Sequence, residues 1–269
     1  MQQIEIAISN GFAAYQRGDL NGARRFLEPV QHPQAWHVLG LVERKAGRFT
    51  EAIAWLERAE AADRQNPEIP NNKGRTALDA SDARLAETSF RRALQLRPDW
   101  GPALNGLGRS LNAQERWSDA GQVWARLKAQ APNDPTIRYN AAMAALETGQ
   151  VEHAAAEFDA LIRSGLTDPA VYFMRGRARV ELSSLDDGLA DFKQSWQVQK
   201  AGHTLRYLAN TLWMVGDQVG FRETVETAPH ELTGLKMYLM AKSGDADAAL
   251  SFSYQAPQSS RDDPVSLTA

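Results

Sequence analysis

Residues 33–66 read PQAWHVLGLVERKAGRFTEAIAWLERAEAADRQN, and this stretch of thirty-four residues decides the fold. Trp36, Leu39 and Gly40 follow one another at spacings of three and four, so they share one face of a predicted helix. Gly40 has no side chain and lets a neighbouring helix approach closely, which offsets the roughly 1 kcal/mol that glycine costs in a helix. The first part of the stretch therefore predicts a helix with a contact face.

The second part of the stretch predicts another helix, which packs on the first. Ala52, Leu56 and Ala59 form an apolar stripe at helical spacing. Gly47 separates the two parts and suits the end of a helix, because glycine readily adopts the left-handed backbone conformation found there. The two helices must run antiparallel, and the stretch is one helix-turn-helix unit.

The same unit recurs every thirty-four residues, without insertion, as far as Gly202. This register is the strongest signal in the sequence, because self-similarity at a fixed period indicates a repeat array. The matching residues are Gly74, Ala86, Phe90 and Pro98 in 67–100, Gly108, Trp124 and Pro132 in 101–134, Gly149, Ala154 and Phe158 in 135–168, and Tyr172, Gly176 and Phe192 in 169–202.

The pattern is weaker at both ends. A first unit is predicted at about 4–32, and units seven and eight at 203–229 and 230–254. Atypical terminal repeats are common because they cap the stack. Residues 255–269 are polar, contain two prolines and show no period, so they are expected to form either a disordered tail or a linker.

These positions resemble the signature of the tetratricopeptide repeat, W-x2-L-G-x2-Y followed by A-x3-F and P. The resemblance covers residues 4–254 in about seven to eight units. It implies an all-α fold, an α-α superhelix in which antiparallel helix pairs stack into a right-handed solenoid. It also implies that the first helix of each pair lines a concave groove.

The resemblance places a set of polar and aromatic side chains on that groove. Asparagine offers a donor and an acceptor to the backbone of an extended chain, and arginine can fork onto carboxylates. The predicted peptide-binding residues are Asn71, Asn72, Arg75, Asn105, Arg109, Asn112, Tyr139, Asn140, Phe173 and Arg177. Each is also the kind of residue found on an ordinary solvated helix face, and this alternative stays open.

Composition excludes several classes of function. The chain has 269 residues, 43% of them hydrophobic and 23% charged, with a formal net charge of −3 and no cysteine. This charge offers no general attraction for nucleic acid. No apolar run is long enough to span a membrane, and the first twenty residues lack the features of a secretory signal. A cytoplasmic protein is expected.

No catalytic motif is present in the sequence. Gly106 and Gly108 lack the third glycine of a phosphate-binding loop, and His230-Glu231 has no second histidine four residues on. We therefore expect no catalytic residue, metal or cofactor within these residues.

Three hypotheses about function follow. The first is a protein-protein interaction module that holds an extended, acidic peptide in its groove. The second is the substrate-recognition region of a larger bacterial enzyme, such as an oxygenase, sulfotransferase or glycosyltransferase. The third is a self-associating scaffold, a homodimer formed through the C-terminal repeats. The apolar residues that would form its interface are Trp213, Met214, Met237, Tyr238 and Met240.

Overall fold

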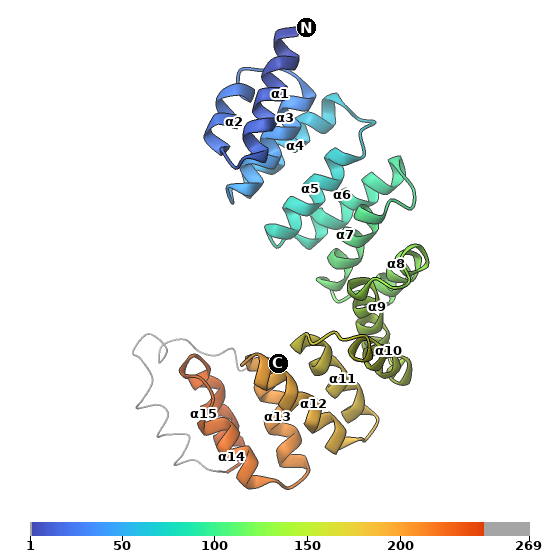
Figure 1. Cartoon of the computed structure of the whole chain (residues 1–269), viewed down its shortest axis with the longest axis vertical. Coiled ribbons are helices and arrows are strands. Elements are labelled where there is room, and N and C mark those ends of the chain that lie inside the picture. The colour runs from blue at the N-terminus through green and yellow to red at the C-terminus, as the bar shows by residue number, and fades with distance from the viewer. Residues whose placement is uncertain (1, 245–269) are drawn as a thin grey trace. The chain divides into compact units, whose positions relative to one another are not determined.

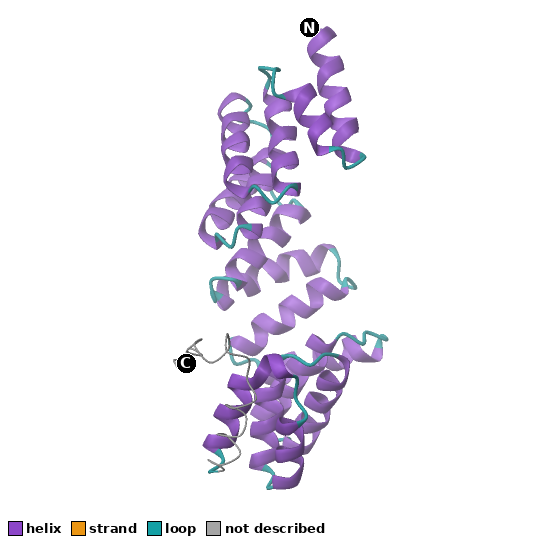
Figure 2. Ribbon diagram, turned by 90° about the vertical axis from the view of Figure 1, so that its left-hand side faces the viewer, coloured by secondary structure: helices purple, strands orange, loops and turns teal. Residues whose placement is uncertain are grey.

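The computed structural model describes residues 2–244, whose regular structure is entirely helical (Figures 1 and 2). The predicted all-α fold of helix pairs is confirmed. In chain order the helices are α1 (Gln2–Gln16), α2 (Leu20–Leu27), α3 (Pro33–Lys45), α4 (Phe49–Ala62), α5 (Glu68–Asp79), α6 (Ala83–Leu96), α7 (Gly101–Asn112), α8 (Trp117–Gln130), α9 (Pro135–Glu147), α10 (Val151–Arg163), α11 (Pro169–Glu181), α12 (Leu185–Val198), α13 (Gly202–Met214), α14 (Gln218–Glu226), the short 3-10 helix η1 (His230–Leu232) and α15 (Thr233–Lys242).

The chain divides into two compact units, unit 1 (Met1–Ala144) and unit 2 (Ala145–Ala269). In each unit a helix packs antiparallel on the next and then on the first helix of the following pair. In unit 1 the first helices of successive pairs also touch, α1 with α3, α3 with α5 and α5 with α7. They thus form a continuous layer, and its surface is called the first-helix face below.

The pair α3 and α4 shows how the sequence builds each unit. Pro33 is the first residue of α3, where its missing N–H costs no hydrogen bond. Gly47 has a φ of 75° in the turn, as expected for glycine there. A Cβ on Gly40 would lie 2.6 Å from Cγ of the fully buried Leu56, so this glycine permits the close contact of the two helices.

The core of unit 1 repeats this arrangement with larger side chains. Phe90 on α6 is fully buried, and its ring lies against two glycines. A Cβ would come within 2.9 Å of the ring at Gly74 on α5 and within 2.2 Å at Gly106 on α7. One aromatic ring therefore joins two consecutive repeats through the space that the missing side chains leave.

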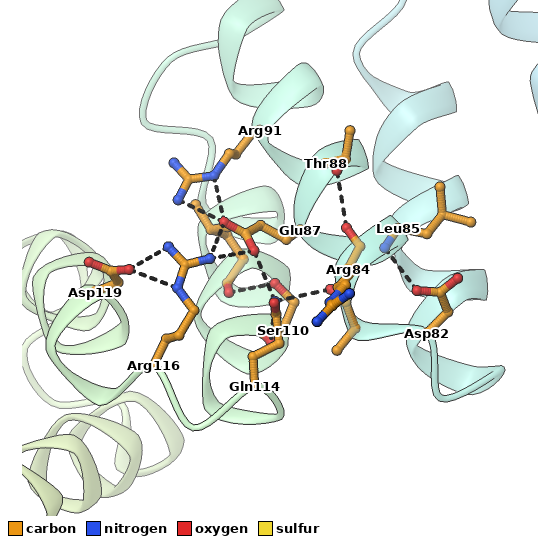
Figure 3. Close-up of polar contacts among 12 residues, drawn as sticks. Asp82, Arg84, Leu85, Glu87, Thr88, Arg91, Ser110, Gln114, Arg116 and Asp119 are labelled. Atoms are coloured by element: carbon orange, nitrogen blue, oxygen red, sulfur yellow. Dashed lines mark hydrogen bonds and ion pairs between the residues drawn. The ribbon is translucent and has the colours of Figure 1, made fainter.

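A polar network on α6 and the turn before α8 also joins two repeats (Figure 3). Glu87 accepts hydrogen bonds from Arg91, Gln114 and Arg116, and Arg116 also binds Asp119. Burial alone would raise the pKa of Glu87, but the hydrogen bonds from Gln114, Arg91 and Arg116 outweigh it and hold the pKa below its usual value. Glu87 is thus a charged, hydrogen-bonded link between the third and fourth repeats.

Unit 2 contains a second charged network, which is more buried. Asp191 on α12 has only 4% of its side chain exposed and lies 2.6 Å from Nη2 of Arg175 and 3.0 Å from Nη1 of Arg179. Asp159 on α10 binds the same two arginines, at 2.7 Å and 3.3 Å. Two carboxylates and two guanidinium groups thus neutralise one another among three helices.

The C-terminal part of the array is shorter than its predecessors. Helix α14 has 9 residues where α12 has 14. The predicted eighth repeat begins with η1 and α15; the rest of that predicted repeat and the predicted tail at 255–269 lie outside the described residues. Among residues 2–244, no helix combines the length and apolar character needed to cross a bilayer.

Candidate peptide-binding surface

Two arginines on the first-helix face of unit 1 are exposed. Arg75 on α5 and Arg109 on α7 stand thirty-four residues apart in the same register, and within residues 2–244 neither side chain forms a hydrogen bond or an ion pair. Partial burial lowers the pKa of Arg75, and the positive charges of Arg44 and Arg109 lower it further, while Asp79 raises it. The two guanidinium groups are therefore near enough to influence each other electrostatically.

A hollow of about 210 Å³ lies on this face, and we call it the basic hollow; three of its wall residues, Tyr15, Arg44 and Asp79, act electrostatically on Arg75. Its walls come from three first helices, with Tyr15 on α1, Leu41, Arg44 and Lys45 on α3, and Asp79 on α5. Lys45 lies over the Tyr15 ring, its Nζ 5.3 Å from the ring centroid. The hollow thus combines an aromatic and an aliphatic wall with a cationic rim.

Asp79 is already engaged inside this hollow. Its Oδ2 lies 2.6 Å from Nε of Arg44, and the two residues belong to consecutive first helices. The pair leaves the ammonium of Lys45 and the guanidinium groups of Arg75 and Arg109 without a carboxylate partner among the described residues. The first-helix face of unit 1 is therefore locally cationic, although the whole chain carries a net charge of −3.

Several predicted peptide-binding asparagines instead join neighbouring repeats. The amide nitrogen of Asn72 lies 2.8 Å from Nε2 of His37, whose pKa is lowered by burial. Asn112 donates to Oδ1 of Asn140 at 3.2 Å and accepts from the indole of Trp124 at 3.3 Å. These three asparagines use their hydrogen-bonding groups within the protein, which favours a packing role.

The remaining two asparagines differ in burial. Asn71 is only 5% exposed and belongs to the wall rather than to the surface. Asn105 is half-buried on α7, and no hydrogen bond of its side chain occurs within residues 2–244. It precedes Arg109 by four residues, so both lie on the same side of the helix. Of the five predicted asparagines, Asn105 is the one best placed to contact a ligand.

The predicted site residues in unit 2 pack against one another. Phe173 on α11 is 9% exposed and makes edge-on contacts with the rings of His203 and Tyr207, at centroid distances of 4.6 Å and 5.2 Å. Arg177 donates to Glu147 at 2.6 Å and lies over the Tyr207 ring. Phe173 is thus a core residue, and Arg177 already has a carboxylate partner.

Tyr139 on α9 is half-buried and makes contacts of its own within the protein. It is the remaining residue of the predicted site.

The predicted apolar patch of the C-terminal repeats is only partly on the surface. Met240 is 1% exposed and Met237 packs against the core of unit 2. Trp213, Met214 and Tyr238 are exposed, with 47%, 60% and 39% of their area accessible. Trp213 also packs on Phe221, with ring centroids 5.6 Å apart.

None of the five residues that line the basic hollow was among the predicted peptide-binding residues. Tyr15 belongs to the atypical first repeat, where no groove position was assigned. Counting from residue 4 places it at the twelfth position of its repeat, the same as Arg44 in the next. This shared register is the signal that could have located it.

The described residues contain no group of three or more His, Cys, Asp or Glu side chains arranged to hold a metal ion. The chemistry that the first-helix face offers is noncovalent, with cationic groups, one half-buried amide and apolar walls.

Comparison with known proteins identifies the family. The model of the tetratricopeptide repeat matches residues 11–67, 71–135 and 139–197, which together make up more than half of the chain. This chain therefore belongs to the tetratricopeptide repeat family.

Solved structures share this fold at low sequence identity. A tetratricopeptide repeat protein from Parabacteroides merdae superposes with a TM-score of 0.68 and 15% identity, covering 93% of this chain and 100% of its own. PilF of Pseudomonas aeruginosa gives 0.60 and 15%, covering 83% of this chain and 97% of its own. MamA of Desulfovibrio magneticus gives 0.58 and 19%, covering 61% of this chain and 93% of its own. At such identities the likeness concerns the fold alone.

One curated relative is similar in sequence. Protein FlbA of Caulobacter vibrioides is 25% identical over 157 residues, which are 58% of this chain. The matched region is only 26% of FlbA, so this chain corresponds to about a quarter of that protein.

Proposed function

We propose that this protein is a protein-protein interaction module that binds an extended, acidic segment of a partner along the first-helix face of unit 1. The observation that carries the proposal is the pair Arg75 and Arg109, which are exposed, in register and without a carboxylate partner among the described residues. A guanidinium in this state can form charge-assisted hydrogen bonds with a carboxylate, the strongest class of hydrogen bond in proteins.

The shape of the surface supports an extended ligand. The cationic groups come from α3, α5 and α7, so they follow the stacking direction of the first helices. A peptide of about twelve residues spans up to roughly 40 Å when extended, enough to contact several repeats. Asn105 supplies an amide that can pair with the backbone of such a peptide.

The proposal is tested with a fluorescein-labelled peptide of about twelve residues, a length sufficient to reach across several repeats. The peptide carries glutamate at every third position, and a second peptide carries glutamine there. Fluorescence anisotropy should show that only the acidic peptide binds, and that raising the salt concentration weakens binding because the charges are exposed. Equal affinity for both peptides would overturn the proposal.

The double variant Arg75→Glu, Arg109→Glu locates the site. Each lost charged hydrogen bond should cost about 1.5 to 3 kcal/mol of binding free energy. The matched control is Arg25→Glu, Arg84→Glu, which makes the same change in net charge at two exposed arginines of the second helices α2 and α6. Unaltered binding in the first variant, or equal loss in both, would place the site elsewhere.

A second candidate function is that of a recognition region within a larger protein, and the match to FlbA favours it. That relative extends well beyond the matched region, so arrays similar to this one occur as parts of longer chains. The proposal includes the case of a bacterial enzyme with a catalytic domain after the repeats. Reading the gene beyond the codon for Ala269 decides it, since a stop codon there rules out a following domain.

A further inference from the structure

The two units carry opposite net charge. Unit 1 has 19 lysines and arginines against 16 aspartates and glutamates, a formal charge of +3, whereas unit 2 has 11 against 17, a charge of −6. The positive excess of unit 1 includes Lys45, Arg75 and Arg109 of the first-helix face, which have no carboxylate partner among the described residues. Each copy of the chain thus carries both a cationic surface and an acidic unit.

The turn between α11 and α12 concentrates acidic residues of unit 2. Residues 181–187 read ELSSLDD, and we call them the acidic turn. Asp186 and Asp187, in the first turn of α12, are exposed and form no ion pair within residues 2–244. Glu181 is also exposed. Burial lowers the pKa of the nearby Arg177, but the hydrogen bond that Arg177 donates to Glu147 raises it, and the charge of Glu181 adds a smaller increase.

Leu182, at the tip of this turn, is an exposed apolar side chain. It is 37% exposed, and the next residue, Ser183, has a left-handed backbone with φ 64°. The equivalent position in the four preceding repeats holds smaller or polar residues, Ala46, Ala80, Gln114 and Thr148. The turn fold itself therefore does not require a large apolar residue here.

We propose that the acidic turn of one copy of this chain binds the basic hollow in unit 1 of a second copy. Leu182 then packs on Tyr15 and Leu41, the aromatic and aliphatic walls of the hollow. The carboxylates of Asp186 and Asp187 meet Lys45, Arg75 and Arg109, which otherwise have no carboxylate partner among the described residues. The inference rests on the proposed function, because it names the acidic segment that the same face binds.

This contact is heterologous, since two different surfaces of the chain meet. A copy that has lost one surface can still use the other. A variant that lacks the basic hollow and a variant that lacks the acidic turn should therefore pair with each other when they are mixed, although neither variant associates alone.

The experiment measures the mass of the full chain by sedimentation velocity over a range of protein concentrations, at low and at high salt. The wild type should associate at low salt and dissociate at high salt, because exposed charges are screened. The double variants Arg75→Glu, Arg109→Glu and Asp186→Arg, Asp187→Arg should each weaken association by at least about a hundredfold, as expected for the loss of two charged hydrogen bonds. An equimolar mixture of these two variants should form a pair of one copy of each.

Three controls keep the result interpretable. Glu152→Arg, Glu223→Arg makes the same charge change at exposed residues of α10 and α14 and should leave association intact. Leu182→Ser should weaken association without changing any charge. The double variant Asp186→Asn, Asp187→Asn should also weaken association. It replaces the arginine variant if thermal melting, monitored by circular dichroism, shows that the arginine variant is unfolded.

The outcomes separate this inference from the proposed function. A wild type that stays monomeric at every concentration, yet binds the labelled acidic peptide, overturns the self-association and leaves peptide binding in place. Association that survives the change at Arg75 and Arg109, or the change at Asp186 and Asp187, also overturns it. Loss of both peptide binding and association in the variant of Arg75 and Arg109 supports both.

Discussion

Arg44 and Asp79 form an ion pair across consecutive first helices, with Nε and Oδ2 2.6 Å apart, at the edge of the basic hollow. Through this pair Asp79 neutralises one positive charge of the hollow, whose remaining charged wall residue is the cationic Lys45. Asp79 also ends α5, where a carboxylate is unfavourable next to the negative end of the helix dipole. The pair therefore moderates the positive charge of this face more than it stabilises the fold.

Replacing Asp79 with asparagine should tighten the binding of the labelled acidic peptide a few-fold at low salt, because Arg44 becomes available. The free energy of unfolding should change by less than about 1 kcal/mol, since a partly exposed ion pair contributes little. Fluorescence anisotropy and urea unfolding measure the two quantities. Glu57→Gln, an exposed site on α4, is the control for net charge. Weaker peptide binding by the Asp79 variant would contradict the role given to Arg44.

The two asparagines of α7 should respond differently to replacement by alanine. Asn112→Ala removes the partner of Trp124 and Asn140 and should lower the free energy of unfolding by about 1 to 3 kcal/mol, leaving peptide affinity unchanged. Asn105→Ala should leave stability nearly unchanged and weaken peptide binding. Urea denaturation and anisotropy on both variants test this, and the reverse pattern would assign the ligand contact to Asn112.

Replacing glycine with alanine should have opposite effects on stability at two positions in unit 1. At Gly106 a Cβ would lie 2.2 Å from the ring of Phe90, so Gly106→Ala should destabilise by about 1 to 3 kcal/mol through overpacking. At Gly121 in α8 the nearest atom is Cβ of Ala144 at 3.8 Å, an ordinary contact. Gly121→Ala should stabilise by up to about 1 kcal/mol through helix propensity. Thermal melting of the two variants makes the comparison.

The Glu87 network predicts a dependence of stability on pH. Because the pKa of Glu87 is lower in the folded state than the unfolded value of about 4.3, its contribution is fully present above that pH. It is lost as the pH falls through the folded pKa. Glu87→Gln should therefore cost about 1 to 2 kcal/mol at pH 7, and the two proteins should become equal in stability in acid. Urea unfolding at pH 7 and below pH 4 measures this, and a constant difference would exclude the network as its source.

The fold could be predicted from the sequence because it depends on a periodic pattern. Gly40, Leu56 and their counterparts recur at fixed spacing, and each repeat contacts only its neighbours, so one unit predicts the next. The role of the asparagines could not be predicted in the same way. Spacing places Asn72 and Asn112 on the first helices, but their partners His37 and Asn140 belong to neighbouring repeats and depend on how the helices pack.

The candidate site was predictable only in part, for a related reason. Register alone placed Arg75 and Arg109 in line, and the structure shows both to be exposed. The register gave no indication that Phe173 packs into the core, because an aromatic residue at that position fits the wall of the array as well as its groove. Nor could it show that Asp79 pairs with Arg44, which depends on side-chain direction.

Within residues 2–244, four residues other than glycine have the left-handed backbone conformation: Ser81, Glu115 and Ser183 in the turns inside helix pairs, and Asp99 between α6 and α7. The corresponding turns elsewhere use glycine, as at Gly47 and Gly149. A side chain in this conformation costs roughly 1 to 2 kcal/mol, partly offset by the greater freedom of glycine in the unfolded chain. Exchanging Ser81 and Glu115 for glycine should therefore raise the melting temperature, so the protein can be made more heat-resistant for laboratory use at two positions that do not line the basic hollow.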